Sequence, residues 1–191
     1  LTKEVEPESY KGELGALATL ALTDAQKRKF VAALDGDVYD DLPKARMALV
    51  LRLESLVRAP GVQLQDAVSL EHVLPQTPPD GSDWIKWFPD EDERDGWTHR
   101  LANLVPLDRN KNSSASNYDF AKKKDAYFRG KGTASPFVLT QEVRSESEWT
   151  PTLLTARQKR LVNVLSTHWN LEIAADNSLP AAAVTAGGLT S

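Results

Sequence analysis

The fold is decided by three stretches: VSLEHVL at residues 68–74, NLVPL at 103–107 and NYDFAKKKDAYF at 117–128. The first two are short, apolar and bounded by turn-forming residues such as Pro75, which predicts two strands. The third has the spacing of an amphipathic helix. A polar loop, DRNKNSSASN at 108–117, joins the second strand to the helix. The order of these elements predicts a β-hairpin with a lysine-rich helix beside it.

Helices are predicted on both sides of this segment. Thr23 and Gln26 have the spacing of a capping box at the start of a helix. Thr150 and Pro151 suit the N-cap and first position of a long C-terminal helix. The helices within residues 23–66 have apolar stripes and are expected to form a packing platform, and nothing in them points to chemistry.

We therefore expect a mostly α-helical protein with a small β-hairpin. The expected parts are a poorly ordered lead-in, the helical platform, the hairpin-and-helix core, C-terminal helices packing on that core, and a disordered tail. They span residues 1–22, 23–66, 67–130, 131–172 and 173–191, respectively.

Composition excludes several classes of site. The 191 residues include no cysteine, which rules out disulfides and cysteine-bound zinc within the chain. No apolar run approaches the roughly 18 residues of a membrane span. The net charge is −4, yet residues 108–131 carry seven basic and three acidic side chains. This basic stretch is either a DNA-phosphate contact or an ordinary solvated helix face. Because the chain begins with Leu1, we expect it to be part of a longer or processed protein.

Three motifs occur in the order found in one nuclease superfamily. LEHVLPQ at 70–76, ANLVPLDRNKN at 102–112 and SASNYDFAKKK at 114–124 resemble the HNH (ββα-metal) endonucleases. They are most similar to the DUF1524 branch, which forms the C-terminal nuclease of GmrSD-type restriction proteins and of SspE in phosphorothioate-sensing defence systems. The resemblance implies a ββα-metal nuclease core packed on the helical platform.

The resemblance assigns His72, Asn103 and Asn112 to catalysis. His72 is the expected general base, since a neutral imidazole is well suited to take a proton from water near pH 7. Mg²⁺ or Mn²⁺ is the expected cofactor, with Asn112 and Glu71 as oxygen ligands. Asn103 is expected to fix the loop and help to orient the base.

The pairing of Glu71 with His72 carries a geometric condition. HNH enzymes more often have aspartate where this chain has Glu71. Consecutive residues of a regular strand also point to opposite faces. Glu71 and His72 can therefore serve one site only at a strand end or a bulge.

Contacts with double-stranded DNA are expected from Lys111, Asn117, Lys122 and Lys123. Phosphate contact is predicted for one of the two neighbouring lysines, and Asn117 has an equally good interpretation as a helix cap. His99, four residues before Asn103, is more typical of a structural histidine.

The resemblance implies a nicking DNA endonuclease in bacterial antiviral defence, acting in the cytoplasm and gated by an upstream N-terminal NTPase or sensor domain. The chain has no phosphate-binding GxxxxGK[ST] loop, so that domain is expected elsewhere. Two alternatives remain open: a catalytically silent DNA-binding module, and a regulatory docking module of a larger NTPase-nuclease.

Overall fold

The structure, a computed structural model, describes residues 21–59, 68–108, 117–129 and 135–172. Its strands are β1 (Val68–His72) and β2 (Leu104–Asp108), and a short 3₁₀ turn, η1 (Leu101–Asn103), directly precedes β2. The helices are α2 (Asp24–Leu34), α3 (Val38–Asp41), α4 (Arg46–Val57), α5 (Asp83–Trp87), α6 (Glu91–Thr98), α8 (Phe120–Arg129), α9 (Val138–Ser145) and α10 (Pro151–His168). The expected fold class, mostly α-helical with a small β-hairpin, is confirmed. The predicted tail and the lead-in up to residue 20 lie outside the described residues.

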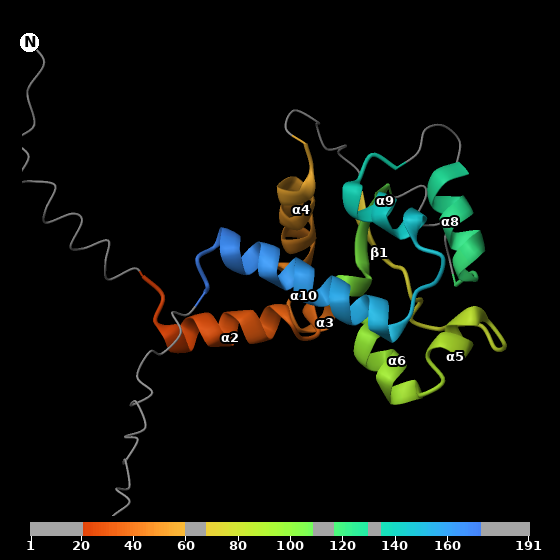
Figure 1. Ribbon diagram of the computed structural model, residues 1–191, viewed down its shortest axis with the longest axis horizontal. Helices are drawn as coiled ribbons and strands as arrows, with labels where there is room; N and C mark the ends of the chain where they lie inside the picture. The colour runs from red at the N-terminus through yellow and green to blue at the C-terminus, as the bar shows by residue number, and fades with distance from the viewer. Residues whose placement is uncertain (1–20, 60–67, 109–116, 130–134, 173–191) are drawn as a thin grey trace, which may run out of the picture.

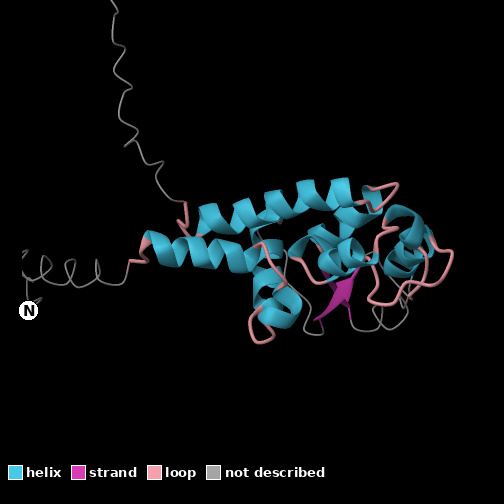
Figure 2. Ribbon diagram, turned by 90° about the horizontal axis from the view of Figure 1, so that it is seen from below, coloured by secondary structure: helices cyan, strands magenta, loops and turns pink. Residues whose placement is uncertain are grey.

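The long helix α10 organises the arrangement of the others. It lies alongside α2 and contacts α4 and η1, as Figures 1 and 2 show from two directions. The hairpin lies under α4 and α9, which both contact β2. The end of β1 itself contacts α3 on one side and α8 on the other.

The two predicted strands pair antiparallel. Glu71 lies opposite Val105, and His72 lies opposite Leu104. The first strand ends at His72 rather than at the expected residue 74. Beyond it, the Val73 amide donates to the Asn103 carbonyl, 3.0 Å away, and the chain then turns. The early strand end places Glu71 and His72 where the chain leaves the sheet.

An aromatic cluster packs beside the hairpin. Trp84, Phe88, Phe120 and Trp149 are fully or almost fully buried. The Trp84 ring makes an edge contact with Phe120 at 5.5 Å between centroids, and its indole N–H donates to the Tyr118 carbonyl at 3.0 Å. Trp84 and Phe88 are therefore core residues.

Helix starts follow the predicted capping signals in two places and depart from them in a third. The Thr23–Gln26 capping box is present, and Thr150 with Pro151 begins α10. Helix α8 begins at Phe120, three residues after Asn117. The predicted cap role of Asn117 is therefore wrong, because the chain between them makes a turn before the helix starts.

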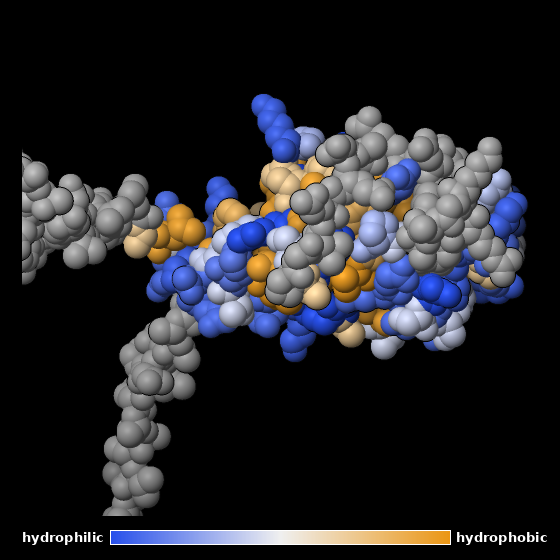
Figure 3. Space-filling model, turned by 90° about the horizontal axis from the view of Figure 1, so that it is seen from above, coloured by the Kyte–Doolittle hydropathy of each residue, from blue (hydrophilic) through white to orange (hydrophobic). Residues whose placement is uncertain are grey.

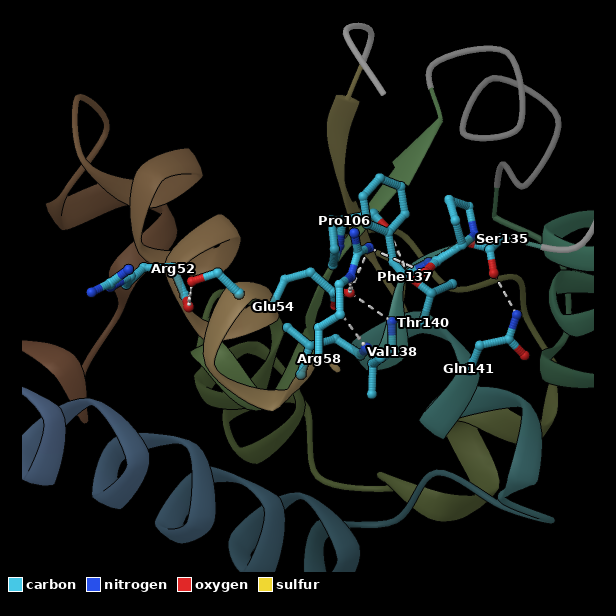
Figure 4. Close-up of polar contacts among 12 residues, drawn as sticks. Arg52, Glu54, Arg58, Pro106, Ser135, Phe137, Val138, Thr140 and Gln141 are labelled. Atoms are coloured by element: carbon cyan, nitrogen blue, oxygen red, sulfur yellow. Dashed lines mark hydrogen bonds and ion pairs between the residues drawn. The ribbon is translucent and has the colours of Figure 1, made fainter. Parts of the chain in front are cut away.

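A buried glutamate fixes α9 against α4. Glu54 is 0% exposed, and its carboxylate accepts hydrogen bonds from the Val138 and Leu139 amides at 2.8 and 3.0 Å (Figure 4). Arg58, one turn later on α4, donates to the same carboxylate at 2.9 Å. Helix α9 has no cap from its own N-cap residue Phe137, so a side chain 84 positions away satisfies its first amides. This helix was not predicted, and its start depends on a tertiary contact.

The surface in Figure 3 mixes hydrophilic and apolar patches. Among the described residues, the large hydrophobic side chains that are exposed are Leu22, Phe30 and Tyr118. No helix in the described part of the chain has both the length and the apolar character needed to cross a membrane.

Candidate active site

Glu71 and His72, the last two residues of β1, line one pocket of about 300 Å³. The other lining residues are Pro75, Gln76, Thr77, Asn117 and Lys123. The condition set by strand geometry is met, because both residues lie at the strand end. Their side chains nevertheless contact different elements, with Glu71 directed to α8 and His72 to α3 and the α6–η1 turn.

The His72 imidazole is enclosed on three sides. Its Nε2 lies 3.2 Å from Nδ1 of His99, and its ring centroid lies 4.3 Å from that of Tyr39. The amide nitrogen of Gln76, a residue that also lines the pocket, lies 3.4 Å from His72 Nδ1 and 3.5 Å from Nε2. Only 9% of His72 is exposed. The contacts with His99 and Tyr39 therefore restrict the ring, and its Nε2 is directed at His99.

Burial lowers the pKa of His72 from its ordinary value of 6.5 to about 3, and His99, Lys123 and Arg46 add to the shift in the same direction. Burial disfavours the charged form, and nearby positive charges disfavour it further. His72 is consequently neutral at pH 7, which is the form able to accept a proton.

Lys123 ties α8 to the end of β1. Its ammonium donates to the Glu71 carboxylate at 2.7 Å and to the His72 carbonyl at 2.6 Å. Burial lowers the pKa of Lys123, and the Glu71 charge opposes that shift. Lys123 is 1% exposed, so its ammonium faces the protein interior. Lys122, the neighbouring residue, is exposed instead.

Asn103 fixes the turn that follows β1. It is 0% exposed, and its amide oxygen accepts from the Leu74 amide at 2.7 Å and the Trp149 indole at 3.1 Å. Its amide nitrogen donates to the carbonyls of Leu74 and Thr98, at 2.9 and 2.8 Å. All of these partners lie in the protein framework, so Asn103 acts on the pocket through the position of the chain around it.

Residues 24–164 match the family model of the C-terminal domain of GmrSD restriction endonucleases. The chain belongs to this family. This match confirms that the three motifs indicate a GmrSD-type C-terminal domain. A comparison with curated proteins gave no match.

Membership in the GmrSD C-terminal family makes this chain a restriction endonuclease domain, a nuclease whose substrate is DNA. The matched range contains both strands, α8 and every residue lining the pocket. The pocket at the end of β1 therefore lies within the part of the chain that matches the family.

Of the remaining predicted site residues of this GmrSD domain, the structure describes two, Asn117 and Lys122. Asn117 is exposed and lines the pocket, so a functional role is still open to it. Lys122 is exposed, with its ammonium 3.4 Å from the centre of the Tyr118 ring. Asn112 and Lys111 lie outside the described residues.

Three residues at the site were not found by sequence reasoning. His99 contacts His72 directly, Tyr39 packs on both imidazoles, and Arg46 lies with its guanidinium 3.7 Å from the centre of the Tyr39 ring. Within the expected N-terminal platform, α3 also contacts the site, because Tyr39 packs against His72. No local motif marks Tyr39 or Arg46, whereas His99 is one of three histidines in the chain and lies four residues before the NLVPL motif.

The donor types in the pocket fit a hard divalent cation. Glu71 offers a carboxylate, and Asn117 offers an amide oxygen at the same cavity. Lys123, 2.7 Å from the carboxylate, already supplies one positive charge. A second cation at Glu71 would need further negative charge nearby, such as that of a phosphate group.

Proposed function

We propose that this GmrSD C-terminal domain is a divalent-metal-dependent, HNH-type DNA endonuclease that cuts one strand at a time. The single observation that carries this proposal is a neutral, oriented imidazole, His72, beside the Glu71 carboxylate in one pocket. Phosphodiester hydrolysis needs a group to accept the proton of water and a way to neutralise charge on the phosphate.

The base in this proposal is Nδ1 of His72. Because His72 Nε2 is directed at His99 Nδ1, the other ring nitrogen, Nδ1, is the one proposed to take a proton from water. A pKa near 3 makes His72 a weak base in the free protein. Binding of a phosphate places negative charge beside the ring, which stabilises the imidazolium and raises its pKa toward the working range.

Glu71 and Asn112 are the proposed metal ligands. A bound Mg²⁺ or Mn²⁺ would supply charge stabilisation on the scissile phosphate and the leaving oxygen. Lys123 positions Glu71 through their 2.7 Å ion pair, and Asn103 holds the turn beside it.

DNA-backbone contacts are proposed for Lys122, Lys111 and Asn117. Lys122 is exposed on α8, the helix that also carries Lys123 to the pocket. We further propose that the domain works in the bacterial cytoplasm as the nuclease of an antiviral restriction system, under the control of an upstream NTPase or sensor domain.

Relaxation of supercoiled plasmid tests the metal dependence and the strand count together. After treatment with EDTA the chain should leave the plasmid intact, and added Mg²⁺ or Mn²⁺ should restore cutting. Open circles should accumulate before linear DNA. Equal activity with and without the chelator, or linear product from the start, would contradict the proposal.

A silent DNA-binding or docking module is the second candidate. Its support is the Glu71–Lys123 ion pair, since the ammonium neutralises the proposed ligand before any metal ion binds. This candidate predicts DNA binding that weakens with salt and no cutting with any divalent ion.

A further inference from the structure

Asp37, Asp40 and His99 form a group of possible metal ligands next to, but separate from, the pocket. One ligand atom from each lies within 4.8 Å of the others. Asp37 is the N-cap of α3, Asp40 lies within α3, and His99 directly follows α6. Donor atoms bound to one ion at about 2.1 Å lie roughly 3–4 Å apart, so modest side-chain movement brings the three into range.

The backbone already holds these elements together. The Tyr39 amide donates to the His99 carbonyl at 3.1 Å, and the two rings stack with centroids 5.4 Å apart. The Asp37 carboxylate accepts from the Asp40 amide at 2.9 Å, which orients it as outer contacts orient metal-binding carboxylates. Asp40 is exposed and free to rotate toward the ion.

The donor set selects the kind of ion. One imidazole and two carboxylates suit Zn²⁺ and similar borderline ions, whereas Mg²⁺ prefers oxygen ligands alone. The preference for a zinc-class ion distinguishes this group from the proposed Mg²⁺ site at Glu71.

His99 connects this group to His72. Its Nε2 lies 3.7 Å from the Asp40 carboxylate, and its Nδ1 lies 3.2 Å from His72 Nε2. Without an ion, the Asp40 carboxylate favours a proton on His99 Nε2, and with that tautomer His99 Nδ1 can accept the Nε2 proton of His72. The Gln76 amide nitrogen lies 3.4 Å from His72 Nδ1 and 3.5 Å from Nε2, so it can donate to whichever of the two is unprotonated, which here is Nδ1.

An ion on His99 Nε2 reverses this pattern. The remaining proton of His99 must then sit on Nδ1, where it is donated to His72 Nε2. Neutral His72 then carries its own proton on Nδ1, so neither of its nitrogens can take a proton from water. Rotation of the Gln76 amide lets its oxygen accept the new Nδ1 proton.

We propose that Asp37, Asp40 and His99 bind one zinc-class divalent ion, and that this ion suppresses cleavage by fixing the tautomer of His72. The binding half stands without the proposed nuclease mechanism, and the suppression half rests on it.

Zn²⁺ binding to the metal-free chain, measured by competition with a chromogenic chelator, tests the site. Asp40→Asn and His99→Asn should weaken binding by at least about tenfold. Asp41→Asn, on the same helix but outside the group, and Glu71→Gln should bind as wild type does. Asp40 is 63% exposed in its side chain, so its variant is expected to fold. Unchanged affinity in Asp40→Asn and His99→Asn would overturn the site.

The coupling has its own readout, which needs no cleavage. Imidazole nitrogen NMR should show His72 passing from the Nε2–H to the Nδ1–H form as Zn²⁺ is added, and Asp40→Asn should shift this change to higher zinc concentration. His72 remaining in the Nε2–H form at zinc saturation would overturn the coupling. In plasmid assays with Mg²⁺, the same zinc concentrations should inhibit wild type and spare Asp40→Asn. Equal inhibition of both would also overturn the coupling, whereas absence of cutting in zinc-free samples would contradict only the proposed nuclease.

Discussion

Nε2 of His72 lies 3.2 Å from Nδ1 of His99, and the two rings meet edge to face at 5.1 Å between centroids. Because the Tyr39 ring packs against both imidazoles, His72 has little freedom to rotate. Because Nε2 is directed at His99, Nδ1 is the nitrogen left for the proposed role as base. The same contact also makes His99 a positioning residue for the proposed base.

Replacing His99 should weaken nicking without abolishing it. His99→Leu removes the acceptor for His72 Nε2, and the loss of one such hydrogen bond should lower the nicking rate constant roughly five- to tenfold. His99→Asn keeps an acceptor near the Nδ1 position and should retain most of the rate. Single-turnover nicking in zinc-free Mg²⁺ measures both. Equal losses in the two variants would argue against a positioning role.

Lys123 should contribute to stability. Lys123→Met removes the ammonium partner of the buried Glu71 carboxylate, which should lower the free energy of unfolding by about 3 kcal/mol. Lys122→Met, the neighbouring exposed position, should change it by less than about 0.5 kcal/mol. Urea unfolding measures both, and similar values for the two variants would contradict the structural assignment of Lys123.

Lys122 should contribute to DNA binding. Loss of one phosphate contact should weaken binding to duplexes of any sequence and reduce the salt dependence of log K by about one unit. Fluorescence anisotropy at several salt concentrations, with Lys122→Met against Lys159→Met on α10, gives the comparison. An unchanged salt dependence in Lys122→Met would remove this residue from the interface.

Protonation of His72 should make the fold less stable in acid. Its pKa is about 3 in the folded protein and 6.5 ordinarily, so between these pH values the unfolded chain binds a proton that the folded chain does not. The free energy of unfolding therefore rises with pH across this window, with a limiting contribution of about 1.4 kcal/mol per pH unit. His72→Gln removes this contribution. The carboxylates contribute equally to the pH dependence of unfolding in wild type and in His72→Gln. The two unfolding curves should diverge from pH 4 to 6.5 and run parallel above pH 7. Parallel curves throughout would show that His72 titrates normally.

The sequence was sufficient for the hairpin and for the helix starts that depend on local chemistry. Short apolar runs mark β1 and β2, and the Thr23 and Thr150 caps are local features. Helix α9 was missed because its first amides are bound by Glu54 of α4. A contact between residues so distant leaves no local pattern.

The candidate site divides in the same way. Glu71 and His72 were found because they are adjacent within one motif, and the structure places both at one pocket. Tyr39 and Arg46 were missed because folding, rather than spacing, brings α3 and α4 to His72. Lys123 was recognised as basic, but its burial follows from the packing of α8 against the strand end.

The rate constant for plasmid nicking by His72→Ala in saturating Mg²⁺, compared with His168→Ala, is the most direct test of the general base. His168 is an exposed histidine at the end of α10, where it contacts Arg52 rather than the pocket. We expect His72→Ala to nick about 10²–10⁴ times more slowly than wild type and His168→Ala to match wild type. Nicking by His72→Ala at the wild-type rate would contradict the assignment of His72 as the base.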